Sequence, residues 1–141
     1  MRKIHTDFSL CSNGNWTLSS NRGTGIYNAE ITLEVNGEIS NCLKGASIVS
    51  NEDEKDEYGE HTRIKLDNIL TEKGLKITAV FRHYSNRNTL LVSVEPENIA
   101  QRDIMLGRCS LLSFGDETHI NAGENDKEAR IMCQSGCNWK S

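Results

Sequence analysis

Apolar and polar residues alternate along residues 75–84, and this alternation limits the possible fold more than any other feature of the sequence. Leu75, Ile77, Ala79 and Phe81 occupy every second position, with mostly polar residues between them. Successive side chains of a β-strand point to opposite faces of a sheet, so this period of two predicts a half-buried antiparallel strand. Phe81 is therefore expected on the buried face of the clearest strand in the chain.

The same pattern predicts two hairpins. A turn at residues 86–88 separates residues 75–84 from a second alternating segment at residues 90–94. An earlier alternating segment, residues 31–35, runs directly into Asn36-Gly37. Asn-Gly between alternating apolar residues is the strongest short-range hairpin signal, because both turn positions need a positive φ.

The rest of the sequence also shows strand patterns, so an all-β chain is expected. Further strands are expected at Asn15–Ser20, Thr62–Leu70, Asp103–Ser113, Thr118–Ala122 and Ala129–Gln134. Residues 51–60 have a helix-like composition without an apolar face, and the acidic run at 52–57 is expected to be a solvated loop. Pro96 is expected between two strands, where it removes no ladder hydrogen bond. About nine strands with Gly and Asn between them predict an antiparallel β-sandwich, a single domain over residues 1–141.

Length and charge exclude several classes of function. A chain of 141 residues is too short for a (β/α)8 barrel, which needs about 200 residues. Its net charge of −4, with no basic cluster, argues against binding nucleic acid through phosphates. No apolar run approaches the ~20 residues of a membrane-spanning helix. The basic N-terminus is not followed by the apolar segment of a signal peptide, so a cytoplasmic protein without membrane partners is expected.

No motif indicates a cofactor or a metal. The five cysteines are expected as free thiols in a reducing cytosol. Cys133 and Cys137 would lie ~13 Å apart on one strand, too far for a shared zinc or a disulfide unless the chain turns between them. None of the four histidines has a partner at a metal-ligand spacing, and His83 is expected as a half-buried, hydrogen-bonded side chain. The acidic run lacks the alternating ligand order of calcium loops.

Aromatic residues are the candidates for stacking on a sugar ring. They are Trp16, Trp139, Tyr27, Tyr58 and Tyr84. In a β-sandwich, any one of these side chains is more often part of the core than a ligand platform. Tyr84 is expected on the mostly polar face of its strand.

An ordered set of motifs carries a resemblance to a known family. The motifs are, in order, Gly59, Ile64-x-Leu66, Gly74-Leu75-x-Ile77, Phe81-Arg82-His83-Tyr84, Leu90-x-Val92-x-Val94, Asn98, Ile104, Leu111-Leu112 and Gly136-Cys137-Asn138-Trp139-Lys140-Ser141. Over residues 15–141 this order resembles the N-terminal β-sandwich domain of melibiase-type α-galactosidases. That domain carries a strand ending in Arg-x-Tyr and later a Gly-x-x-Ser-Trp-Ser stretch. Gly136, Trp139 and Ser141 match the latter stretch. Asn138 and Lys140 depart from it.

The resemblance implies a galactose-mutarotase-like supersandwich that precedes a catalytic (β/α)8 barrel. Such a domain is non-catalytic, packs on the barrel, supports homo-oligomers and can lend an aromatic residue, here Trp139, to a sugar site. The family nucleophile lies in a Lys-aromatic-Asp motif. Lys65-Leu66-Asp67 lacks the aromatic residue, so Asp67 is not expected to be catalytic. In the family, the β-sandwich contains further strands after the position that corresponds to Ser141. The resemblance therefore implies a domain that is incomplete at its C-terminal end.

No catalytic residue is assigned. A retaining glycosidase needs two carboxyl groups about 5–5.5 Å apart, and the sequence identifies no such pair, so the chain alone is not expected to hydrolyse a glycoside. Two alternatives stay open. One is a stand-alone carbohydrate-binding sandwich. The other is a structural or interaction sandwich, which a long exposed edge strand or a large apolar patch would favour.

Overall fold

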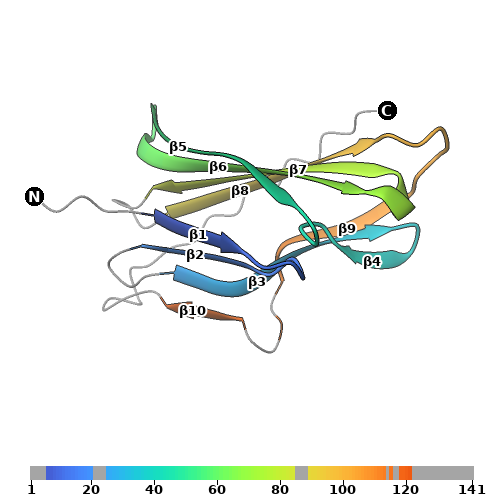
Figure 1. Cartoon of the computed structure of the whole chain (residues 1–141), viewed down its shortest axis with the longest axis horizontal. Helices are drawn as coiled ribbons and strands as arrows, with labels where there is room; N and C mark the ends of the chain where they lie inside the picture. The colour runs from blue at the N-terminus through green and yellow to red at the C-terminus, as the bar shows by residue number, and fades with distance from the viewer. Residues whose placement is uncertain (1–5, 21–24, 85–88, 114, 116–117, 122–141) are drawn as a thin grey trace, which may run out of the picture.

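Two antiparallel sheets lie face to face and enclose one apolar core (Figure 1). The computed structural model describes residues 6–20, 25–84, 89–113, 115 and 118–121. The described strands are β1 (Thr6–Leu10), β2 (Trp16–Ser20), β3 (Gly25–Val35), β4 (Glu38–Asn41), β5 (Ser47–Asp56), β6 (Gly59–Leu70), β7 (Leu75–Tyr84), β8 (Thr89–Asn98), β9 (Leu106–Ser113) and β10 (His119–Asn121). A 3-10 turn, η1 (Thr71–Lys73), joins β6 to β7. The predicted antiparallel β-sandwich is confirmed.

The strand β3 is the centre of the six-stranded sheet. Its first half pairs with β2 and β10, and its second half pairs with β4 and β9. The change of partners falls near Asn28, which has a φ of 56°. The Asn28 N–H donates to Thr17 Oγ1 at 3.1 Å, and its carbonyl accepts from Thr118 Oγ1 at 2.6 Å. These bonds support a local irregularity that lets one strand serve two sets of neighbours.

The Asn36-Gly37 turn connects β3 to β4 as predicted. Asn36 has a φ of 50° and Gly37 a φ of 84°, the two positive values that a tight two-residue hairpin requires. Asn36 also fixes the start of β9, because its N–H donates to the Met105 carbonyl and its Oδ1 accepts the Met105 N–H. The turn therefore holds both neighbours of the second half of β3.

The second sheet has the order β5-β6-β7-β8, each strand antiparallel to the next. The segment predicted most clearly forms β7, and every residue of β7 from Leu75 to Tyr84 is paired with β8. The expected turn at residues 86–88 and the expected strand at 129–134 lie outside the described residues. No helix in the described segments is long and apolar enough to cross a membrane.

An aromatic cluster joins the two sheets. Phe81 of β7 is fully buried, as predicted. Its ring centroid lies 4.8 Å from that of Trp16 and 5.0 Å from that of Phe8. Trp16 comes from β2 and Phe8 from β1, so the cluster packs the first sheet onto the middle of the second. Edge-on and tilted ring pairs of this kind add to the stabilisation from burial.

The acidic run at residues 52–57 was predicted to be a solvated loop, and this prediction is wrong. Residues 47–56 form the strand β5, and every residue from Ser50 to Asp56 pairs with β6. The strand lies at the edge of its sheet and is exposed on both faces. Backbone pairing with β6 therefore holds it in place without the apolar face that its sequence lacks.

Pro96 lies within β8, opposite Ile77, and not between two strands as expected. The Ile99 N–H donates to the Gly74 carbonyl, so the odd-numbered residues at this end of β8 point their N–H groups at β7. An even-numbered proline therefore removes no hydrogen bond to β7, and the strand continues through it. The strand β1 was not predicted, and it pairs with β2 over all five of its residues.

Candidate functional site

Three residues considered for chemistry lie outside the described residues: Trp139, Cys133 and Cys137. Asp67 is described and lies on β6, facing away from the core. Its Oδ1 accepts a hydrogen bond from Thr78 Oγ1 at 3.3 Å, across to β7. This contact links two strands and offers no second carboxyl group.

Most of the described aromatic residues are unavailable for stacking on a sugar. Trp16 is in the core, and Tyr84, expected on a polar face, is only 3% exposed. Tyr27 stacks on His119 with ring centroids 4.5 Å apart. Tyr58 is 55% exposed. It is the one described member of the candidate set that presents a large open surface.

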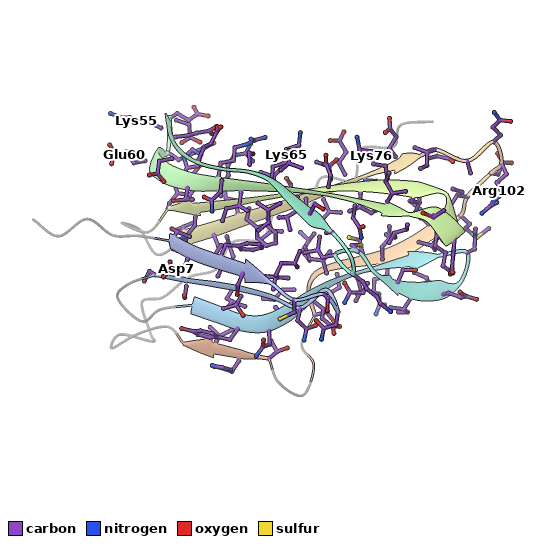
Figure 2. The ribbon with its side chains drawn as sticks, in the orientation of Figure 1. Asp7, Lys55, Glu60, Lys65, Lys76 and Arg102 are labelled. Atoms are coloured by element: carbon purple, nitrogen blue, oxygen red, sulfur yellow. The ribbon has the colours of Figure 1, made fainter. Side chains whose placement is uncertain are left out.

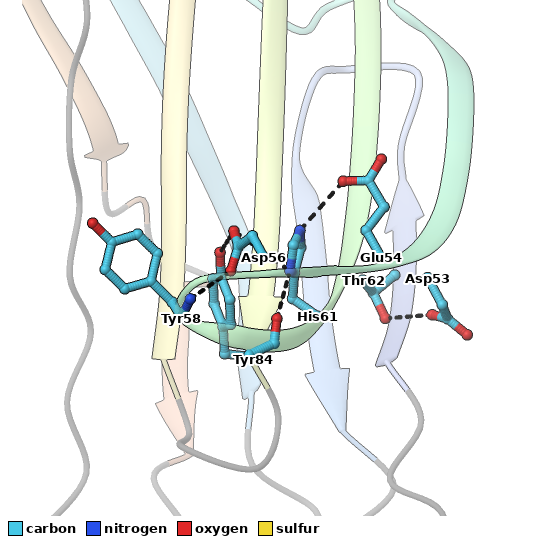
Figure 3. Close-up of polar contacts among 8 residues, drawn as sticks. Asp53, Glu54, Asp56, Tyr58, His61, Thr62 and Tyr84 are labelled. Atoms are coloured by element: carbon cyan, nitrogen blue, oxygen red, sulfur yellow. Dashed lines mark hydrogen bonds and ion pairs between the residues drawn. The ribbon is translucent and has the colours of Figure 1, made fainter.

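A polar cluster lies beside the turn of the β5–β6 hairpin, on the face of the sheet away from the core (Figure 3). Strand register creates it: Glu54 pairs with His61, and His61 lies beside Tyr84 because Thr62 pairs with His83. Asp56 is two residues beyond Glu54, next to the turn. Three strands thus bring one histidine, one tyrosine and two carboxylates together.

Asp56 connects the hairpin turn to β7. Its Oδ2 accepts the Tyr84 hydroxyl at 2.6 Å, and its Oδ1 accepts the Tyr58 N–H at 2.8 Å. Burial and the Asp56 carboxylate raise the pKa of Tyr84 to about 12. The bond from Tyr84 in turn lowers the pKa of Asp56, although partial burial opposes this. Near neutral pH the tyrosine stays protonated and the aspartate ionised, so this bond fixes the turn and transfers no proton.

His61 completes the cluster. Its side chain is 1% exposed, and its ring lies 4.5 Å from the Tyr84 ring, between centroids. Nδ1 is 3.3 Å from the Gly59 carbonyl oxygen, which requires a donor, so Nδ1 carries a proton. Nε2 lies 3.4 Å from Glu54 Oε2, close enough for an ion pair but without hydrogen-bond geometry. Nδ1 also lies 3.8 Å from Asp56 Oδ2, so two carboxylates flank the buried ring.

The geometry supports positioning more than catalysis. Asp56 and Tyr84 are committed to each other, and His61 is enclosed. Within the described segments, no group of three or more His, Cys, Asp or Glu side chains is arranged to hold a metal ion. The cluster makes the hairpin tip rigid, and Tyr58 projects from that tip.

His83 lies on the opposite, core-facing side of β7. It is 5% exposed, so it is more deeply buried than expected, and its Nδ1 is 2.7 Å from Thr6 Oγ1, which provides the expected hydrogen bond. Burial lowers the pKa of His83 to about 4. The folded chain therefore resists protonation of this ring.

Acidification is expected to destabilise the fold through His83. The unfolded chain binds this proton near pH 6.5, so the stabilisation is complete above that value and is lost as the pH falls towards 4. Between about pH 7.5 and about pH 5, the loss is about 2 kcal/mol. Urea unfolding at both values should show a smaller loss for His83→Gln than for the wild type. An equal loss in the two proteins would rule out His83 as the source.

Comparison with known proteins returned no match to a family model, to a curated protein or to a solved structure.

Proposed function

We propose that the chain is a non-catalytic β-sandwich domain of an α-galactosidase-like glycoside hydrolase. Its role is to pack on the catalytic barrel of that enzyme and to support its assembly into oligomers. Sugar hydrolysis belongs to the barrel. Trp139 is the residue proposed to contact sugar, and it lies outside the described residues.

One observation supports this proposal most directly. The residues that carry the resemblance fall on consecutive strands of one sheet, in the order of the family motifs: Ile64 and Leu66 on β6, Leu75, Ile77 and Phe81 on β7, and Leu90, Val92 and Val94 on β8. Their side chains are all buried against the first sheet. Arg82 and Tyr84 stand at the end of β7, where the family has its Arg-x-Tyr.

The transcript beyond codon 141 tests the proposal. It is expected to encode barrel strands, one of which ends in Lys-aromatic-Asp. The protein made from the whole frame should release nitrophenol from a nitrophenyl α-galactoside, whereas the 141-residue chain should release none. A frame that stops within a few codons, or a whole-frame product inactive on α-galactosides, would contradict the proposal.

A second candidate is a stand-alone carbohydrate-binding sandwich, which the exposure of Tyr58 favours. Isothermal titration with galactosides should then give heat that Tyr58→Ala or Trp139→Ala removes. Tyr27→Ala is the matched control, since Tyr27 already stacks on His119. The absence of heat at millimolar sugar would eliminate this candidate.

A further inference from the structure

The dipeptide Asn-Gly occurs twice in the chain, at Asn13-Gly14 and at Asn36-Gly37. In such a pair the glycine nitrogen can attack Cγ of the asparagine side chain, because glycine has no Cβ to hinder the approach. A C–N bond forms, the Cγ–Nδ2 bond breaks, and ammonia leaves with the proton of the glycine N–H. Water then opens the resulting succinimide ring, and the product is either aspartate or its β-linked isomer.

The peptide group between Asn13 and Gly14 is held on both sides. The Gly14 N–H donates to the Cys11 carbonyl at 2.9 Å, and the Asn13 carbonyl accepts from Asn41 Nδ2 at 3.2 Å. The Asn41 amide also fills the space beside Gly14, where an added Cβ would lie 2.3 Å from Asn41 Oδ1. The Gly14 nitrogen can therefore attack only after a hydrogen bond has been broken.

The peptide group between Asn36 and Gly37 is open. In the described part of the chain, neither the Asn36 carbonyl nor the Gly37 N–H has a hydrogen-bond partner. Both residues are exposed, and an added Cβ at Gly37 would meet no atom within 4 Å. The turn lies at the same end of the sandwich as Arg102, which Figure 2 labels. Solvent can therefore remove the Gly37 N–H proton, which must leave as the nitrogen attacks.

The side-chain amide of Asn36 is polarised for this attack. Its Oδ1 accepts the Met105 N–H at 2.9 Å. Such a donor stabilises the negative charge that develops on this oxygen when the nitrogen adds to Cγ. Asn13 shares the feature, because its Oδ1 accepts the Asn15 N–H at 3.0 Å. The state of the glycine N–H is therefore what distinguishes the two sites.

Reaction at Asn36 would alter a turn that holds three strands. A two-residue turn fixes the register of the strands that it joins. The β-linked isomer places one more atom in the main chain of this turn, between the paired residues Val35 and Glu38. The contacts between Asn36 and Met105 depend on the same backbone. The pairing of β3 with β4 and with β9 is therefore expected to loosen.

We propose that Asn36 is a site of spontaneous covalent modification, at which the Gly37 nitrogen displaces ammonia and the turn is converted to aspartate and β-linked aspartate. The modification loosens β4 and β9. Asn13 is protected by the hydrogen bond that the Gly14 N–H donates. This inference goes beyond the proposed glycosidase role and holds whether or not a barrel accompanies the chain.

Incubation of the folded chain in mildly alkaline buffer, made with water labelled with heavy oxygen, tests both sites at once. Peptide mass spectrometry should show Asn36 converted about tenfold faster than Asn13, the factor that corresponds to breaking about one hydrogen bond before the attack. Each product should carry heavy oxygen, and chromatography should separate the β-linked isomer from aspartate. The midpoint of denaturation should fall as Asn36 is converted.

Two controls separate the effect of the structure from that of the dipeptide. In guanidinium chloride both pairs lose their surroundings, so their rates should become similar. Asn36→Gly keeps a residue that adopts a positive φ and removes the reacting amide, so only Asn13 should be converted and the midpoint should stay constant. In the folded wild type, conversion of Asn13 as fast as Asn36, no conversion of Asn36, or conversion without a fall in the midpoint would each overturn the proposal.

Discussion

Replacing Phe81 by aspartate is expected to unfold the chain at 25 °C. Phe81 is fully buried between Trp16 and Phe8. Truncation of such a side chain costs ~3–5 kcal/mol, and a buried carboxylate without a partner adds several more. A domain of this kind is stable by only ~5–15 kcal/mol. Circular dichroism on heating should therefore show no cooperative transition for the variant.

Ile69→Asp is the matched control. Ile69 belongs to the neighbouring strand β6 but is 57% exposed. Replacing this exposed apolar side chain by aspartate should alter the free energy of unfolding by about 0.5 kcal/mol or less. If Phe81→Asp melts within a few degrees of the wild type, Phe81 is not on the buried face of β7.

Replacing Asn68 by alanine is expected to cost about 2–4 kcal/mol. Asn68 is 8% exposed, and its Nδ2 donates to the Cys42 carbonyl at 2.7 Å and to the Lys44 carbonyl at 2.9 Å. These two bonds attach β6 to the connection between β4 and β5. Alanine leaves both carbonyl oxygens without this donor. The free energy of unfolding in urea measures the loss.

Two further variants separate the hydrogen bonds from packing. Asn68→Asp keeps the shape but turns the donor into an acceptor, so it should cost at least as much as alanine. Asn98→Ala also removes two hydrogen bonds, an exposed one to the Arg102 carbonyl and a part-buried one from the Ala100 N–H, and it should cost less than Asn68→Ala. Equal losses of unfolding free energy for Asn68→Ala and Asn98→Ala would show that burial of the Asn68 amide does not determine its contribution to stability.

The sequence was sufficient for the strands whose apolar residues alternate. β7 and the Asn36-Gly37 turn follow from local rules, because a half-buried strand and a two-residue turn each impose their residue types directly. The strands of the facing sheet contribute the other half of the core. The class of fold could therefore be predicted from these elements alone.

The polar cluster could not be predicted, because it depends on register between strands. Glu54 and His61 are seven residues apart in the sequence, and Tyr84 is far from both, yet pairing aligns them. The strand β5 could not be predicted from the acidic run either, because an edge strand that is exposed on both faces needs no apolar residues. One signal was present: Glu52, Glu54 and Asp56 alternate up to a turn that ends in Gly59, which has a φ of 121°.

The position of β3 has a consequence for how the chain folds. Its neighbours β2 and β4 are close in sequence, but β9 and β10 are far away: Glu30 pairs with Ser113 and Tyr27 with His119. During synthesis, one side of β3 must therefore wait until almost the whole described chain has left the ribosome. Pairing of such distant segments makes folding slow, on the order of milliseconds to seconds. Over that interval β3 presents an unpaired apolar edge, and nascent chains would be most prone to associate through it.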